Sequence, residues 1–118
     1  MTSRRDRLYR LLPALHRALD LVRYASDASP YRLIPQVVVM AHDASDVART
    51  LEYGRERKVP VTFRAGGTSL NGQGQTDGIL VDVRRHFNGY RVLEGGEAVS
   101  VQPGTVLAHV NRGLARHQ

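Results

Sequence analysis

The sequence has no cysteine, no tryptophan and a single lysine, Lys58, among its 17 basic residues. Without cysteine, the chain cannot form a disulfide, a thiolate metal site or a cysteine nucleophile. It also lacks the run of about 18 apolar residues that a membrane-spanning helix needs, and the apolar segment and cleavage site of a secretory signal. Any redox chemistry of this chain would therefore depend on a bound cofactor.

With 118 residues and a hydrophobic content of 42%, the chain has the size of one ordinary domain. The formal net charge is +6, and seven arginines lie within residues 4–32. This basic charge favours anionic partners. Nucleic acid is one such partner, but the arginines are not interleaved with aromatic residues and no helix-turn-helix pattern accompanies them. We therefore expect a solvated basic face and no nucleic-acid partner.

Residues 1–23 have apolar side chains at helical spacing with arginines at polar positions between them. The apolar residues are Leu8, Leu11, Leu12, Leu15, Leu19 and Val22. Proline lacks the N–H that a helix interior uses. We therefore predict an amphipathic helix that is kinked, or begins afresh, near Pro13.

A connector at residues 24–36 leads to an alternation of strand and helix patterns. Residues 37–40 form a short apolar run, typical of a strand that is covered on both faces. Asp43 is suited to cap a helix that runs to Lys58, and a second strand is expected at 59–63. The expected inward face of the helix is Val47, Leu51 and Gly54. Strand, helix and strand make a βαβ unit, so the two strands are expected to be parallel.

The remaining pattern predicts a third strand at 79–83 and a hairpin over 90–101 with its turn at 94–97. Thr105 follows a Pro-Gly pair and is expected to cap a last helix over residues 106–117.

A glycine-rich loop joins the second and third strands, and it has the composition of a phosphate-binding loop. Gly66 and Gly67 have no Cβ to prevent a positive φ, so the backbone can turn tightly and direct successive N–H groups toward an anion. Thr68 and Ser69 add hydroxyl donors at the same point. The loop is therefore predicted to bind a diphosphate.

Two common nucleotide-binding motifs do not fit this loop. A Walker loop requires Gly-Lys-Ser/Thr, whereas Gly67 is followed by Thr68. The dinucleotide fingerprint requires a helix directly after the glycines, whereas Gly78 leads into the strand at Ile79. The predicted diphosphate site is therefore a loop between two strands.

Three segments carry a resemblance to a known family. They are Arg64–Gln73, Asp27–Pro35, and Val101–Gly104 with Asn111 in the helix that follows. These segments resemble the pyrophosphate loop and flanking signatures of the FAD-binding flavoproteins typified by vanillyl-alcohol oxidase and p-cresol methylhydroxylase. The resemblance covers about residues 20–118. Within the family, the amino-acid sequences of Asp27–Arg32 and Thr62–Leu70 are most similar to the D-lactate dehydrogenase-like branch.

The resemblance implies an α+β fold. It would be the first α/β subdomain of a p-cresol methylhydroxylase-type FAD-binding domain, with a βαβ unit followed by a strand, a hairpin and a helix. The expected organisation is an N-terminal amphipathic helical segment at 1–23 and an incomplete FAD-binding domain at 24–118.

The resemblance also assigns the cofactor site. The residues implied in FAD binding are Arg64, Ala65, Gly66, Gly67, Thr68, Ser69, Leu70, Asn71, Gly72, Gln73, Pro35, Pro103 and Gly104. The diphosphate would lie on the amides of residues 65–69 and on the Thr68 and Ser69 hydroxyls. Ala65 stands where glycine is frequent, so its φ must be negative. Arg64 either offsets diphosphate charge or forms a surface ion pair.

The histidines indicate how the flavin is held. Some relatives attach the flavin covalently to a histidine, but none lies within residues 64–76, so FAD is expected to bind non-covalently. The five histidines also lack metal-ligand spacing, and no metal site is expected.

By resemblance, the parent protein is expected to be a D-lactate or 2-hydroxyacid dehydrogenase that transfers a hydride from the hydroxyl-bearing carbon of a small 2-hydroxyacid to FAD. Its catalytic residues, and an iron–sulfur cluster where one is present, are expected outside these 118 residues, so this piece alone should be inactive. An oxidase of the same family and a free-standing nucleotide- or nucleic-acid-binding module are the alternatives. The expected location is cytoplasmic, and the alternative is peripheral association with the inner membrane.

Overall fold

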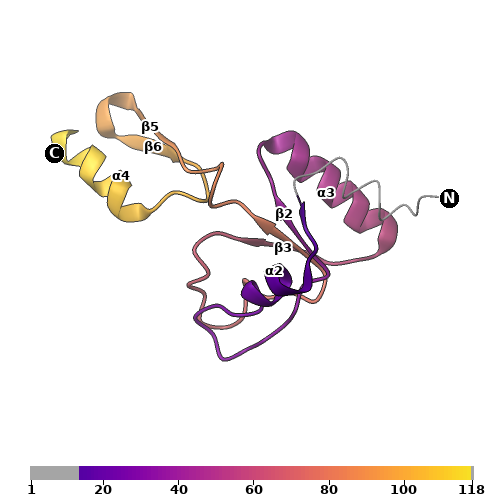
Figure 1. Ribbon diagram of the computed structural model, residues 1–118. Helices are drawn as coiled ribbons and strands as arrows, with labels where there is room; N and C mark the ends of the chain where they lie inside the picture. The colour runs from indigo at the N-terminus through magenta and orange to yellow at the C-terminus, as the bar shows by residue number, and fades with distance from the viewer. Residues whose placement is uncertain (1–13, 118) are drawn as a thin grey trace.

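A four-stranded sheet and a separate two-stranded hairpin organise residues 14–117, the part of the chain that the computed structural model describes (Figure 1). The elements are β1 (Ala14–Leu15), α2 (Ala18–Arg23), β2 (Val37–Met40), α3 (Ala44–Arg57), β3 (Val61–Arg64), β4 (Ile79–Asp82), β5 (Tyr90–Leu93), β6 (Ala98–Val101) and α4 (Leu107–Leu114), with 3-10 turns η1 (Glu94–Gly96) and η2 (Ala115–His117). None of the helices within residues 14–117 is long and apolar enough to cross a membrane.

The sheet has the order β1-β2-β4-β3. β4 pairs in parallel with both β2 and β3, and β1 pairs antiparallel with β2. The strands of the predicted βαβ unit, β2 and β3, are therefore parallel as expected, with β4 inserted between them. β3 and β4 are parallel neighbours joined by the glycine-rich loop, without a helix in the crossover.

The core lies on both faces of this sheet. Val38 and Val39 in β2, and Leu80 and Val81 in β4, are at most 1% exposed. Because side chains alternate along a strand, the members of each pair occupy opposite faces. β2 is therefore covered on both faces, as its apolar run predicts. Residues of α3 and β3, including Val47, pack against the face that carries Val39 and Val81.

α3 begins and ends at the residues that its sequence predicts. The Asp43 carboxylate accepts the N–H of Asp46 at 2.9 Å, and Lys58 closes the helix with a left-handed φ of 54°. The predicted inward face is wrong at Leu51, which is 46% exposed, because the buried positions of the helix are Asp46, Thr50 and Gly54. Thr50 is small and Gly54 has only a hydrogen atom in place of a side chain, so the helix can approach the sheet closely.

The hairpin β5–β6 and helix α4 are also found where the sequence places them. The cap of α4 differs from the prediction. Val106 is the N-cap residue and makes no side-chain hydrogen bond to the helix, whereas the Thr105 hydroxyl donates to the Gly89 carbonyl at 3.0 Å. Thr105 thus holds the start of the hairpin instead of the helix.

The N-terminal prediction differs in part. Residues 1–13 lie outside the described residues, so the expected helix is not tested there. From residue 14 on, Ala14–Leu15 pair with Val38 and Val39 as β1, and the helix begins only at Ala18. The edge of β2 offers unpaired backbone groups to an extended segment, and this pairing prevails over the helical spacing at Leu15.

The molecule is elongated, with extents of 59 × 32 × 22 Å. In Figure 1 the hairpin and α4 project to one side of the sheet, α3 lies above the sheet, and α2 with the connector lies below it. The glycine-rich loop lies beside the connector, since the Ala28 N–H donates to the Gly67 carbonyl at 2.9 Å.

Candidate functional site

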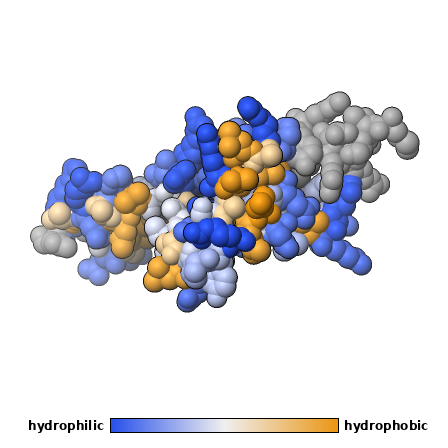
Figure 2. Space-filling view, turned by 60° about the horizontal axis from the view of Figure 1, so that its bottom comes forward, coloured by the Kyte–Doolittle hydropathy of each residue, from blue (hydrophilic) through white to orange (hydrophobic). Residues whose placement is uncertain are grey.

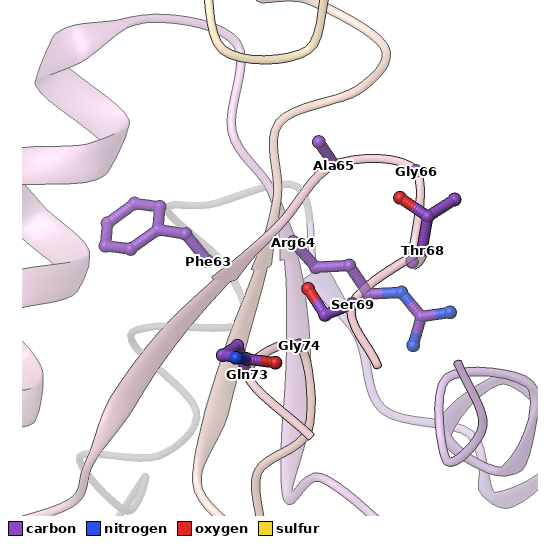
Figure 3. Close-up of a pocket in the computed structure, with 9 residues that line it drawn as sticks. Phe63, Arg64, Ala65, Gly66, Thr68, Ser69, Gln73 and Gly74 are labelled. Atoms are coloured by element: carbon purple, nitrogen blue, oxygen red, sulfur yellow. The ribbon is translucent and has the colours of Figure 1, made fainter. Parts of the chain in front are cut away.

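The glycine-rich loop begins at the carboxyl end of β3 and encloses a shallow pocket of about 140 Å³ (Figure 3). Its lining residues are Phe63, Arg64, Ala65, Gly66, Gly67, Thr68, Ser69, Gln73 and Gly74. Ligands of open parallel sheets bind beyond the carboxyl ends of the strands, and the loop occupies that position. In Figure 3 the Arg64 side chain extends beneath the loop, whereas Phe63 points to the opposite side of β3.

The backbone of this loop presents N–H groups that are unpaired among the described residues, and such groups are hydrogen-bond donors. Within residues 14–117, none of the N–H groups of residues 66–69 donates a hydrogen bond. Gly67 adopts a φ of 68°, the left-handed region that favours glycine, and Ala65 has the negative φ that was expected. Thr68 is exposed, so its hydroxyl is accessible as well. Consecutive free donors on a tight turn form an anion-binding concavity.

Arg64 is occupied by backbone carbonyl groups. Its Nη1 donates to the Tyr24 carbonyl at 3.1 Å and its Nη2 to the Ser26 carbonyl at 2.6 Å. The guanidinium also lies 5.5 Å from the centre of the Tyr24 ring. Among the described residues Arg64 forms no ion pair, so the expected alternative of a surface ion pair is wrong.

The connector is ordered by Asp27. One carboxylate oxygen of Asp27 accepts the Ser29 hydroxyl and the Ser29 N–H. The hydroxyl of Ser29 holds the pKa of Asp27 below its usual value, helped by the Ser29 N–H, the Gln75 amide and the Arg64 charge, while desolvation opposes these effects. The other oxygen is buried and makes no hydrogen bond within residues 14–117.

Asp82 ends β4 beside this site and is 2% exposed. It accepts the Tyr24 hydroxyl at 2.7 Å and the Arg84 N–H at 2.8 Å. Burial, together with the hydrogen bond to the Asp82 carboxylate and its charge, raises the pKa of Tyr24 to about 12. Tyr24 therefore remains a neutral donor that fixes the connector to the end of the sheet.

The structure brings together only part of the implied cofactor set. Arg64 through Ser69 and Gln73 line the pocket, and Gly74 and Phe63 join them although the sequence did not single them out. The remaining residues, Leu70, Asn71, Gly72, Pro35, Pro103 and Gly104, do not line it. Gly72 lies against the Tyr31 ring, where a Cβ would be 2.9 Å from the nearest ring atom.

Gly104 borders a second hollow of about 410 Å³, next to the start of α4. It is lined by Arg84, Asn88, Tyr90, Gly104, Thr105, Val106 and His109. A Cβ on Gly104 would lie 2.4 Å from the Val83 carbonyl oxygen, so glycine is required there by close backbone approach.

The histidines form no metal site among residues 14–117, where no group of three or more His, Cys, Asp or Glu side chains could hold an ion. His42 and His86, which are far apart in the sequence, meet edge to face with ring centres 4.2 Å apart. The His42 Nδ1 lies 3.7 Å from the Asp46 carboxylate. Burial of Asp46 favours its neutral form, but the hydrogen bonds from the His42 N–H and Arg49 outweigh this effect and lower its pKa.

Comparison with protein families gives the decisive match. The model of the FAD binding domain family matches residues 35–118. The chain belongs to this FAD-binding family. The match includes the parallel strands β2, β3 and β4, the glycine-rich loop, the hairpin and α4, and it confirms the resemblance inferred from the sequence.

Two curated relatives place the FAD-binding chain within the family. D-2-hydroxyglutarate dehydrogenase of Pseudomonas putida is 43% identical over 97 residues, which cover 79% of this chain and 10% of that protein. Glycolate oxidase subunit GlcD of Bacillus subtilis is 32% identical over 96 residues, which cover 77% of this chain and 20% of that protein. The chain thus spans a tenth to a fifth of the length of these relatives.

The fold is also shared with a solved structure. The crystal structure of p-cresol methylhydroxylase with substrate bound superposes with a TM-score of 0.74 at 19% identity, covering 94% of this chain and 24% of that one. At this identity the likeness shows the fold alone. It confirms the expected α+β subdomain of the p-cresol methylhydroxylase type.

Proposed function

We propose that the loop after Arg64, at residues 65–69 together with Gln73 and Gly74, binds the diphosphate of a non-covalently held FAD. The observation that carries this proposal is the set of free N–H groups of residues 66–69, which lie on a concave loop at the carboxyl end of β3. The Thr68 and Ser69 hydroxyls would add two donors. The pocket accommodates a diphosphate better than a ring, because it is small and shallow and is lined mainly by small and polar residues.

The second hollow is proposed to receive another part of the same cofactor. Gly104 and its neighbours lie there, and the implied set includes Pro103 and Gly104. A role in FAD binding is also proposed for Leu70, Asn71, Gly72 and Pro35. Their contacts with the cofactor would lie outside the pocket described above.

The parent protein is proposed to be an FAD-dependent D-2-hydroxyacid dehydrogenase. Both curated relatives carry names of enzymes that act on 2-hydroxyacids or their salts, namely D-2-hydroxyglutarate and glycolate. When bound, the flavin would accept a hydride from the hydroxyl-bearing carbon of the substrate. This chain supplies orientation of the cofactor through its loop, whereas the substrate-binding and proton-accepting groups, and any iron–sulfur cluster, would belong to segments beyond residue 118. An oxidase is the alternative, because one relative is named as a subunit of glycolate oxidase.

The test uses the longer protein in which this chain is proposed to lie. We expect it to be purified with a flavin that denaturation releases into solution, and D-2-hydroxyglutarate or D-lactate to bleach the flavin absorption under anaerobic conditions. Rapid recovery of the absorption on admission of oxygen would favour the oxidase. A protein that contains no flavin and takes none up would contradict the proposal.

A further inference from the structure

We propose that Arg64 is a positioning residue that holds the diphosphate loop in its binding conformation through residues 24–29 of the connector. Its guanidinium does not itself bind the diphosphate. This inference rests on the proposed function, because it assigns how the same loop is shaped.

The first observation is the set of contacts of Arg64. Both terminal nitrogens donate to connector carbonyls, those of Tyr24 and Ser26, and the guanidinium lies against the Tyr24 ring. Its planar fork is thus engaged on the side of the connector. The same group fills the space at the Cα of Gly67, where a Cβ would lie 2.5 Å from Nη2. Arg64 is therefore packed between the connector and the turn of the loop.

The second observation concerns the peptide that links Gly67 and Thr68. The Gly67 carbonyl accepts the Ala28 N–H of the connector at 2.9 Å. Among the described residues every peptide bond is trans, and in a trans peptide the C=O and the N–H point in opposite directions. Because the connector holds the carbonyl of this peptide, the Thr68 N–H is directed away from the connector. One hydrogen bond thus orients one of the proposed diphosphate donors.

The third observation is that the connector also contacts the far end of the loop. The Gln75 side-chain oxygen accepts the Leu33 N–H at 3.1 Å, and Gly72 lies against the Tyr31 ring. The buried oxygen of Asp27 lies 3.5 Å from the position of a Cβ on Gly74. The loop is therefore supported along its length, and Arg64 is the side chain that fixes the end of the support nearest β3.

The Arg64→Lys substitution distinguishes a positioning role of Arg64 from direct binding of the diphosphate. Lysine keeps the positive charge but cannot span two carbonyl groups with a planar fork. If Arg64 acts on the diphosphate as a charge, Arg64→Lys retains most of the affinity. If Arg64 acts through the connector, Arg64→Lys behaves like Arg64→Ala.

The experiment measures amide hydrogen exchange by NMR on the ligand-free 118-residue chain, and then titrates the same samples with ADP and with FAD. The wild type is compared with Arg64→Lys, Arg64→Ala and the control Arg55→Ala, which removes an exposed charge on α3. Exchange of the Val38 and Val81 amides reports whether each variant is folded. Arg64→Lys is the milder substitution and stands in where Arg64→Ala does not fold.

We expect both Arg64 variants to accelerate exchange of the Ala28 amide by at least about tenfold while the core amides stay protected. We also expect both to weaken ADP binding by roughly tenfold, about 1.4 kcal/mol, with Arg55→Ala unchanged. Unchanged Ala28 exchange, or an Arg64→Lys variant that binds as the wild type does, would overturn the inference. If no variant and no wild type binds ADP or FAD, the proposed function fails, and the exchange of Ala28 still decides whether Arg64 positions the loop.

Discussion

Two adjacent glycines of the loop differ in what they allow. Gly67 has a φ of 68° and a Cβ there would lie 2.5 Å from the Arg64 guanidinium, whereas a Cβ on Gly66 would meet only the Thr68 methyl group at 3.7 Å. We predict that Gly67→Ala destabilises the chain by about 1–2 kcal/mol and weakens ADP binding, while Gly66→Ala is close to neutral. Urea unfolding and ADP titration of the two variants check this. Equal effects of the two substitutions would contradict it.

Tyr24 gives the site a pH dependence on the alkaline side. Its pKa is raised to about 12 from an ordinary value of 10.0, so the stability that it contributes is fully present below pH 10 and is lost as the pH rises toward 12. We predict that the wild type loses stability over this range and that Tyr24→Phe loses less. At neutral pH the phenylalanine variant should be less stable by about 1–2 kcal/mol, because the buried Asp82 carboxylate loses a donor. Unfolding midpoints at several pH values test both statements.

Asp27 gives a dependence of the opposite sign. Its pKa is lowered, so its contribution is present above its ordinary pKa of 3.8 and is lost as the pH falls below that value. We predict that acid releases the connector, seen as faster exchange of the Ser29 amide, before the sheet unfolds. Asp27→Asn should show the fast exchange already at neutral pH. Exchange of Ser29 that is independent of both pH and this substitution would contradict the role of Asp27.

The packing of α3 on the sheet depends on Gly54. A Cβ at this position would lie 2.5 Å from a methyl group of Val61 and 3.0 Å from the Val59 carbonyl oxygen. Although alanine favours a helix over glycine, we predict that Gly54→Ala destabilises the fold by about 1–3 kcal/mol through overpacking. The double variant Gly54→Ala with Val61→Ala should recover part of the loss, because it removes the clashing methyl group but leaves the carbonyl. A more stable single variant in thermal unfolding would refute this account of the contact between helix and sheet.

Elements with strong local signals could be predicted from the sequence. The apolar runs gave β2 and β4, Asp43 marked the start of α3, and the Gly-rich turn marked the hairpin. Leu51 and Thr105 were predicted wrongly because burial of a helix face and use of a hydroxyl depend on neighbours that are distant in sequence. The same holds for β1, which exists only because the edge of β2 is available.

The candidate site shows the same division. The glycines and hydroxyls of the loop were recognisable because they act locally. The role of Arg64 was not, since its partners Tyr24 and Ser26 lie about 40 residues earlier in the chain. The Asp-Ala-Ser sequence at residues 27–29 was a usable signal for a tight turn in the connector, but nothing local indicates that this turn supports the loop.

At the scale of the whole molecule, apolar groups remain on the surface. Figure 2 shows apolar side chains gathered in patches on the face in view. At the start of α4, Val106 is 55% and Leu107 is 70% exposed. Exposed apolar patches promote association. We predict that the 118-residue chain binds a hydrophobic fluorescent dye, that Leu107→Ser lowers the fluorescence, and that its unfolding midpoint stays unchanged. A wild type that does not bind the dye would contradict this.

The most direct test of the central claim is a titration of the isotope-labelled chain with FAD and with ADP, followed by amide chemical shifts. If the loop at residues 65–69, with Gln73 and Gly74, binds the diphosphate, both ligands should give weak, saturable shifts that are largest at the amides of Gly66, Gly67, Thr68 and Ser69. Shifts that are absent up to the solubility of the ligands, or that are centred on the arginines outside the loop, would contradict the assignment of this loop as the FAD diphosphate site.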